Sequence, residues 1–170
     1  VGQGGLLDIV LDPQFSVNRF IYFSYVRGTS GGMATTVARA RLEGMALREL
    51  EVIFNAYPMT GKDHHFGSRL LFALDGTLLI TLGDRGHRSW AQDRTIHPGS
   101  VVRIWPTGAI PNDNPFVGDT RGGDAIFSYG NRNPQGLAMN PSTGEIWMHE
   151  HGPQGGDKLN RLSAGVNYGW

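Results

Sequence analysis

Short apolar segments recur along the whole chain, and most of them show the two-residue alternation of a β-strand. Residues 35–42 alternate with Arg39 and Arg41 on one face, which is typical of a strand with one face toward water. Residues 20–26 are apolar on both faces, which indicates a strand covered on both sides. The other segments with strand character are residues 6–11, 49–55, 100–105, 125–130, 135–139, 145–150 and 158–162.

No segment has the long 3.6-residue periodicity of an amphipathic helix. Residues 45–50 have helical propensity, but the run is too short to hold alone. Residues 90–98 read as a polar loop or a single turn, and residues 106–123 as a long irregular connection rich in Pro and Gly. Loops of that length in a compact fold are usually functional or mobile. The pattern therefore predicts an all-β fold with many turns.

The strongest local signal is Asp75-Gly76 between two apolar runs, which predicts a β-hairpin. A hairpin returns the chain to its starting edge. His65, just before the first strand, and Asp84, just after the second, should therefore lie at the same end of the hairpin. There they can form a base and its orienting partner, or they can be two solvated loop residues.

A degenerate repeat relates three parts of the chain. A strand, an Asp/Asn-Pro or Asp-Gly turn and an aromatic-rich strand recur around Asp12-Pro13, Asp75-Gly76 and Asn140-Pro141. The intervals are roughly sixty residues, near the upper end for the four-stranded blades of a propeller. Short, evenly spaced strands suit a sandwich, a barrel or a propeller, and the repeat favours the propeller.

Composition narrows the class of partner. The 170 residues are enough for one ordinary domain with a real core, and 15 Lys and Arg balance 15 Asp and Glu. This balance argues against nucleic acid or an anionic membrane as the main partner. No apolar run is long enough to span a membrane. The absence of cysteine excludes disulfides, thiol catalysis and thiolate metal sites.

A second candidate site is the polar turn that holds Arg132, Asn133 and Gln135 between two strands. The guanidinium fork of arginine suits carboxylates, and the amide groups donate to carbonyl oxygens. The turn would make a good surface for a small, flat, polyanionic ligand. The alternative is a turn whose polar groups satisfy the local backbone.

A third candidate site begins at His149 and ends at Asp157. His149 and His151 share one face of a strand and His65 could be a third ligand, so zinc is one candidate ion. The glycine-rich turn that follows suits oxygen ligation better. Backbone carbonyls of Gly152 and Pro153, with Asp157 nearby, fit a hard cation such as calcium whose shell a ligand completes.

Seven motifs in one order carry a family resemblance. They lie at residues 5–15, 65–70, 83–86, 112–116, 130–136, 151–160 and 165–170. Together they resemble the soluble quinoprotein sugar dehydrogenases of the glucose/sorbosone dehydrogenase family, which includes the aldose sugar dehydrogenases. The resemblance implies a six-bladed β-propeller that binds pyrroloquinoline quinone (PQQ). Residues 1–170 would form a partial propeller domain of about three blades, with its N- and C-terminal parts missing.

The resemblance also implies a reaction. His65 would be the general base that takes the proton from the anomeric hydroxyl of an aldose, while hydride moves from that carbon to PQQ and a lactone forms. Asp84 and Asp157 would hold and polarise this histidine or the nearby waters.

The resemblance further assigns Arg132, Asn133 and Gln135 to PQQ binding. The main-chain oxygens of Gly152 and Pro153 would hold calcium. The implied partners are a sugar, an external electron acceptor and the rest of the propeller, from missing sequence or another chain. The implied location is periplasmic or secreted.

The residues alone leave two other functions possible. A non-catalytic propeller that binds a partner would tend to lose His65 or the Arg132-Asn133-Gln135 set, and both are present. A divalent-metal lactone hydrolase would need several acidic ligands that converge on the central channel, and the sequence offers few.

Overall fold

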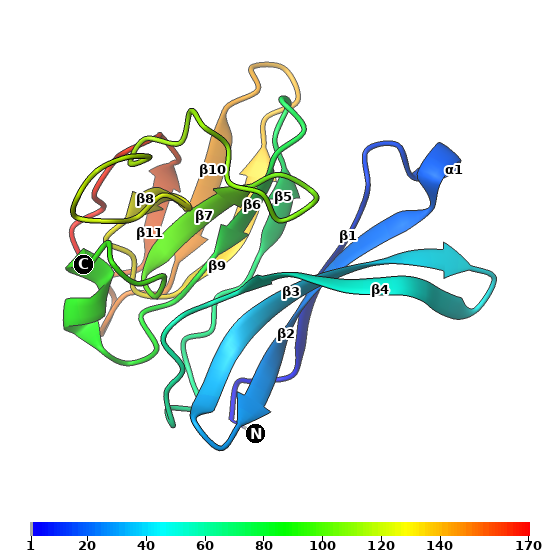
Figure 1. Cartoon of the computed structure of the whole chain (residues 1–170). Helices are drawn as coiled ribbons and strands as arrows, with labels where there is room; N and C mark the ends of the chain where they lie inside the picture. Colours follow the sequence, from blue (N-terminus) through cyan, green and yellow to red (C-terminus); the bar gives the residue numbers. More distant parts are fainter. Residues whose placement is uncertain (1) are drawn as a thin grey trace.

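The computed structural model describes residues 2–170, which form three antiparallel sheets in chain order (Figure 1). Sheet A has the order β1 (Leu6–Leu11), β2 (Phe20–Thr29), β3 (Gly32–Glu43), β4 (Ala46–Asn55). Sheet B has the order β5 (Leu70–Phe72), β6 (Leu78–Thr81), β7 (Ser100–Ile104), β8 (Ile126–Tyr129). Sheet C consists of β9 (Pro134–Met139), β10 (Ile146–Glu150) and β11 (Lys158–Arg161). The prediction of an all-β chain is confirmed.

Each predicted repeat falls in a different sheet. The Asp12-Pro13 turn lies between β1 and β2, the Asp75-Gly76 turn joins β5 to β6, and the Asn140-Pro141 turn joins β9 to β10. In all three cases the two strands on either side of the turn pair with each other. The sequence repeat therefore corresponds to the structural repeat of one sheet.

Two local elements differ from the sequence pattern. Residues 46–50 extend β4 although they had helical propensity, because the register pairs Leu47 with Leu42 of β3. A single helical turn, α1 (Phe15–Asn18), was not expected. It forms because Asp12 accepts hydrogen bonds from the Gln14 N–H and from Asn18 Nδ2, both at 2.8 Å. The expected turn near Trp90 is the 3₁₀ helix η1 (Arg88–Gln92).

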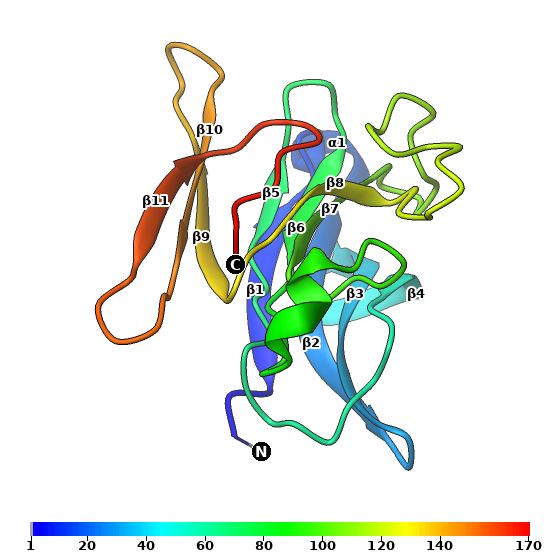
Figure 2. The same ribbon diagram turned by 90° about the vertical axis from the view of Figure 1, so that its left-hand side faces the viewer.

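Sheet B lies between the other two sheets and is buried on both faces (Figures 1 and 2). Leu78 and Ile80 of β6 pack with Tyr22 of sheet A, whereas Leu79 packs with Met148 of sheet C. Alternate residues of one strand thus face different neighbouring sheets. Each fully buried aliphatic side chain contributes about 1.5–3 kcal/mol. The sheets pack face to face in chain order, as neighbouring blades do.

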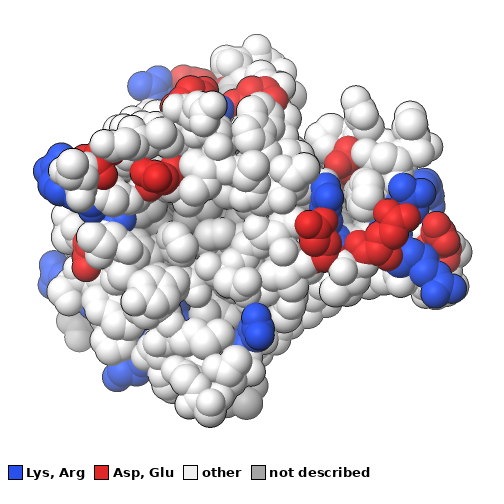
Figure 3. Space-filling model, viewed as in Figure 1, with Lys and Arg blue, Asp and Glu red and all other residues white. Residues whose placement is uncertain are grey.

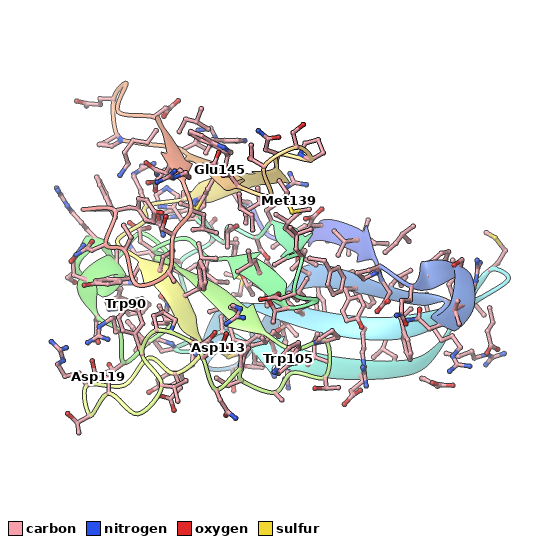
Figure 4. The ribbon with its side chains drawn as sticks, turned by 90° about the horizontal axis from the view of Figure 1, so that it is seen from above. Trp90, Trp105, Asp113, Asp119, Met139 and Glu145 are labelled. Carbon is pink, nitrogen blue, oxygen red and sulfur yellow. The ribbon has the colours of Figure 1, made fainter. Side chains whose placement is uncertain are left out.

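The long connection after β7 is anchored to sheet B by one buried arginine. Arg103 is 7% exposed and donates to Asp113 at 2.8 Å, to Asn114 at 3.1 Å and to Asp75 at 2.7 Å. The connection is therefore tied to the β5–β6 turn. Seen from above, its residues Asp113 and Asp119 lie on the opposite side of sheet B from Glu145 of sheet C (Figure 4).

Charged side chains of both signs mix over the end of sheet A that projects away from sheets B and C (Figure 3). Arg39 pairs with Glu51 at 2.8 Å and Arg41 with Glu49 at 3.5 Å on this sheet. Among residues 2–170, no helix has the length and apolar character needed to cross a membrane.

Candidate functional site

The β5–β6 hairpin brings His65 and Asp84 into direct contact. His65 Nδ1 lies 2.7 Å from Asp84 Oδ1, and the two side chains are 14% and 2% exposed. The prediction that they meet at one end of the hairpin is confirmed. An ionised carboxylate can only accept, so the proton lies on Nδ1 and Nε2 is the basic nitrogen of the ring.

A glycine makes this contact possible. A Cβ at Gly83 would clash with the His65 carbonyl and approach Asn133 Oδ1 to 2.9 Å. Only glycine lets the segments of His65 and Asn133 come so close to the end of β6. The Asp84 N–H then donates to the Arg132 carbonyl at 2.8 Å, which links the hairpin to the polar turn of sheet C.

The environment of Asp84 favours its charged form. Burial raises the pKa of the carboxyl, but hydrogen bonds from His65, from the Trp170 indole and from the Gly86 N–H outweigh burial and lower it. Asp84 is therefore a buried, fully ionised partner for the His65 ring at neutral pH. This arrangement fixes the tautomer that a general base at Nε2 requires.

Arg85 holds the loop before His65 in place. Its guanidinium is 3% exposed, lies 3.6 Å from the centre of the Phe66 ring and donates to the backbone carbonyls of Met33, Lys62 and His64. Burial lowers the pKa of Arg85 to about 10. Because one buried side chain donates hydrogen bonds to three carbonyls, it restricts the movement of the loop before His65.

The three predicted cofactor residues lie together on the turn between sheets B and C. Arg132 Nη1 donates to the His151 carbonyl at 3.2 Å. Gln135 Nε2 donates to the Gly67 carbonyl and to Asn133 Oδ1, both at 2.9 Å. Both amide hydrogens of Gln135 are thus used within the protein, so this side chain also organises the turn.

A cavity of about 300 Å³ adjoins this turn. Its lining comes from the segment that leads into β1, the loop before β5, the turn that leads into β9 and the residue after β10: Gln3, Leu7, Phe66, Gly67, Ser68, Arg69, Asn133, Gln135 and His151. Ser68 Oγ is buried and has no hydrogen-bond partner among the described residues. A buried, unpaired hydroxyl in the lining of a polar cavity fits a site that a polar ligand completes.

The turn after β10 presents main-chain oxygens rather than a cluster of side-chain ligands. Within residues 2–170, no group of three His, Asp or Glu side chains is placed to hold a metal ion. The Pro153 carbonyl accepts the Gly156 N–H at 2.9 Å, which leaves its second lone pair free. Asp157 Oδ1 accepts the Gly152 N–H at 2.9 Å and closes the turn. These oxygens fit a hard cation better than zinc.

The predicted calcium site at this turn can be tested by replacing Gly152 with Ala, which is expected to lower calcium affinity at least about tenfold if the turn holds the ion. The added Cβ would collide with the backbone of Gly156, so the turn could not keep its shape. Gly61→Ala is the control, because a Cβ there meets nothing within 4 Å. Calorimetric calcium titration compares the variants, and equal affinities would remove Gly152 from the ion site.

The remaining candidate residues, Asp157, His149 and His151, form no hydrogen bond with the His65–Asp84 pair in the described part of the chain. Asp157 is 70% exposed and bonded within its own turn, and among residues 2–170 no hydrogen bond joins it to His65 or Asp84. Its role beside the base stays a prediction. His151 lines the cavity, whereas the His149 ring lies against Gly136 on sheet C.

Three side chains that sequence reasoning missed also build the site. Gln3 Oε1 accepts the His65 N–H at 2.8 Å, and Trp170 donates to Asp84 at 2.7 Å. Glu150, 1% exposed, accepts the Arg132 N–H at 2.6 Å. Strand alternation between two exposed histidines could have indicated that Glu150 points inward. No local signal marks Gln3 or Trp170.

Comparison with known proteins decides the family. The model of the glucose/sorbosone dehydrogenase family matches residues 1–170. The chain belongs to the glucose/sorbosone dehydrogenase family. Aldose sugar dehydrogenase YliI of Escherichia coli is 44% identical over 99% of the chain and 46% of its own length. Quinoprotein glucose dehydrogenase B of Acinetobacter calcoaceticus is 31% identical over 99% of the chain and 40% of its own length.

Solved structures of the family share the fold. The soluble aldose sugar dehydrogenase of Escherichia coli, in its apo form, superposes with a TM-score of 0.96 at 44% identity over 99% of this chain and 50% of its own. The PQQ-bound aldose sugar dehydrogenase of Streptomyces coelicolor gives 0.86 at 30% identity, over 99% and 48%. The chain spans about half the length of the relatives it matches, and the prediction of about three propeller blades is confirmed.

Proposed function

We propose that this chain carries the catalytic base and part of the cofactor site of a PQQ-dependent sugar oxidoreductase, which oxidises an aldose at its anomeric carbon to the lactone. The observation that carries the proposal is the buried His65–Asp84 pair next to a polar cavity. Family membership and the PQQ-bound relative support the same reaction class.

The protein's own part in the reaction is proton transfer and orientation. Asp84 keeps the proton of the His65 ring on Nδ1, so Nε2 can take the proton of the anomeric hydroxyl. Arg85 holds the His65 loop against movement, since it bonds three of the carbonyls around it. PQQ, when bound, supplies the hydride acceptor.

The polar turn and the cavity fit a flat polyanionic cofactor. Arg132 would pair with a carboxylate or a quinone oxygen, and Asn133 and the unpaired Ser68 hydroxyl would add hydrogen bonds. Gln135 would keep Asn133 and the backbone at Gly67 in place. The main-chain oxygens of Gly152 and Pro153 would hold calcium at the same edge, and a cation there favours negative charge on a bound ligand.

The direct test uses the protein expressed from its complete gene. After incubation with PQQ and calcium, glucose and other aldoses should reduce an artificial electron-acceptor dye, and the lactone product should accumulate. PQQ without calcium and calcium without PQQ are the controls. If the loaded protein reduces the dye equally with and without sugar, the proposed activity is wrong.

Replacing Arg132 with Ala is expected to raise the Kd for PQQ about 10- to 100-fold, the usual cost of losing a hydrogen bond to a charged group. Arg121→Ala is the matched control, because Arg121 is 78% exposed and pairs with Asp119 of the long connection. Quenching of protein fluorescence during PQQ titration measures both affinities. Equal affinity in the two variants would exclude Arg132 from the cofactor site.

The two alternatives have less support. A purely binding propeller would not need a buried carboxylate that fixes one tautomer of His65. A metal-dependent lactone hydrolase needs converging acidic ligands, and the described residues offer no cluster of three. A periplasmic or secreted location, an external electron acceptor, and the absence of nucleic-acid partners belong to the same proposal.

A further inference from the structure

Trp170 completes the hydrogen bonding of the buried carboxylate. The Trp170 Nε1–H donates to Asp84 Oδ2 at 2.7 Å, while Asp84 Oδ1 accepts from His65 at 2.7 Å. Each carboxylate oxygen is thus held by a ring N–H. The tryptophan stands 86 residues further along the chain than the aspartate, so the contact is purely tertiary.

The backbone holds Trp170 in this position. Residues 165–170 return alongside β8 toward η1 (Figure 2), where the Trp170 N–H donates to the Gly130 carbonyl at 2.9 Å. Tyr168 N–H donates to the Tyr129 carbonyl at 2.9 Å, and Gln92 Nε2 donates to the Trp170 carbonyl at 2.9 Å. The indole therefore approaches Asp84 from a fixed backbone and not from a free segment.

We propose that Trp170 is a positioning residue that fixes the Asp84 carboxylate and, through it, the orientation of the His65 ring. Without the indole N–H, the carboxylate could rotate about its Cβ–Cγ bond while it stayed bonded to the Gly86 N–H. The Nδ1–H of His65 would then lose its single defined acceptor. The catalytic consequence rests on the proposed function, but the orientation of the ring does not.

Trp170 also joins the base to the cofactor turn. The Arg132 guanidinium lies 5.6 Å from the centre of its ring, and that of Arg88 lies 4.3 Å away. Both cations polarise the indole and strengthen its N–H as a donor to the carboxylate. The tryptophan thereby contacts both the candidate PQQ-binding arginine and the partner of the base.

Other titratable groups also face this pair, and the test must keep them unchanged. The His64 ring packs edge-on against His65 with centroids 4.7 Å apart, and His64 Nδ1 lies 3.3 Å from Asp63. The buried Arg85 cation lies next in the chain to Asp84. A substitution at position 170 alters none of them.

The first experiment needs neither PQQ nor sugar. The protein from the complete gene is labelled, and the ring N–H resonances of His65 are observed by NMR. In the wild type, the His65 Nδ1–H should give one sharp signal that exchanges slowly with solvent, because it has a single fixed acceptor. With Trp170→Phe, this signal should broaden and exchange about tenfold faster, since the carboxylate can rotate away from the ring. Trp147→Phe, on sheet C and 38% exposed, is the matched control. A signal in Trp170→Phe that stays as sharp and as slowly exchanging as in the wild type would overturn the proposal.

The second experiment measures turnover of the PQQ- and calcium-loaded protein. Trp170→Phe should lower kcat about tenfold with little change in KM, because a misoriented base slows proton removal without weakening sugar binding. A rise in KM at an unchanged kcat would indicate a merely structural role and overturn the proposal. If the loaded wild type oxidises no sugar, the proposed function fails, and the NMR measurement still decides the role of Trp170.

A third measurement uses the unmodified protein, in case Trp170→Phe does not fold. The Trp170 indole N–H should exchange slowly with solvent, because it donates to a buried carboxylate. An indole N–H that exchanges as fast as that of Trp147, which is 38% exposed, would contradict the proposal.

Discussion

Replacing His65 with Asn is expected to lower kcat for aldose oxidation about a thousandfold, while the affinity for PQQ changes little. A positioned general base contributes about 10²- to 10⁴-fold to the rate. In the proposed reaction, His65 would supply Nε2 for proton removal, whereas the predicted cofactor contacts come from the polar turn of sheet C and from the loop after β10. Steady-state assays of the loaded protein, with PQQ titration of the apoprotein, measure the two quantities separately.

Asparagine is the substitution that disturbs the backbone least. His65 has a φ of 53°, in the left-handed region that asparagine tolerates better than most residues. The Asn amide can also donate to Asp84, so the buried carboxylate keeps a partner. His64→Asn is the adjacent control, since the His64 side chain is 37% exposed and pairs with Asp63. If the two variants lost turnover equally, or if His65→Asn stayed active, His65 would not be the base.

The sequence predicted the pair because its geometry depends on local signals. Asp75-Gly76 determines the hairpin, and the two strands around it are nearly equal in length, so His65 and Asp84 return to one edge. The repeat of turns predicted the three sheets for the same reason, since each turn joins neighbouring strands. Signals within about twenty residues were enough for the pair, whose members stand 19 positions apart.

The rest of the site depends on contacts that no local pattern encodes. Gln3 reaches His65 across 62 positions, and Trp170 reaches Asp84 across 86. The first contact arises only once sheets A and B have packed, and the second only once the 165–170 segment has returned along β8. Arg85 belongs to the motif at residues 83–86, but the three carbonyls that it bonds come from two other segments.

Helix propensity is overridden at residues 46–50, also because of tertiary contacts. Residues 46–50 favour a helix in isolation, yet the register with β3 places them in a sheet. The three cross-strand pairs Arg41–Arg48, Leu42–Leu47 and Glu43–Ala46 outweigh a few tenths of a kcal/mol per residue of propensity. The same reasoning applies at the site, where packing decides which polar side chains meet. The hydrophobic pattern of the sequence therefore predicts the strands, whereas the packing of the sheets brings the side chains of the site together.

Replacing Asp84 with Asn is expected to lower kcat by about 10²- to 10³-fold, with only a small change in PQQ affinity. Three donors surround this carboxylate: the ring N–H groups of His65 and Trp170 and the Gly86 N–H. An amide has one acceptor atom, so its NH₂ group must face one of these donors. The arrangement is relieved if the His65 proton moves to Nε2, which removes the base.

Asp113→Asn is the matched control for this substitution. The pKa of both carboxyls is lowered, that of Asp113 by its hydrogen bond from Arg103, but only Asp84 contacts His65. Because the pKa of Asp84 in the folded protein lies below its unfolded value, its ionisation stabilises the fold at neutral pH. That stabilisation disappears as the pH falls through the folded pKa. The Tm difference between wild type and Asp84→Asn should therefore shrink on acidification. A rate loss in both Asn variants, or a Tm difference independent of pH, would show that Asp84 does not act as the ionised partner of His65.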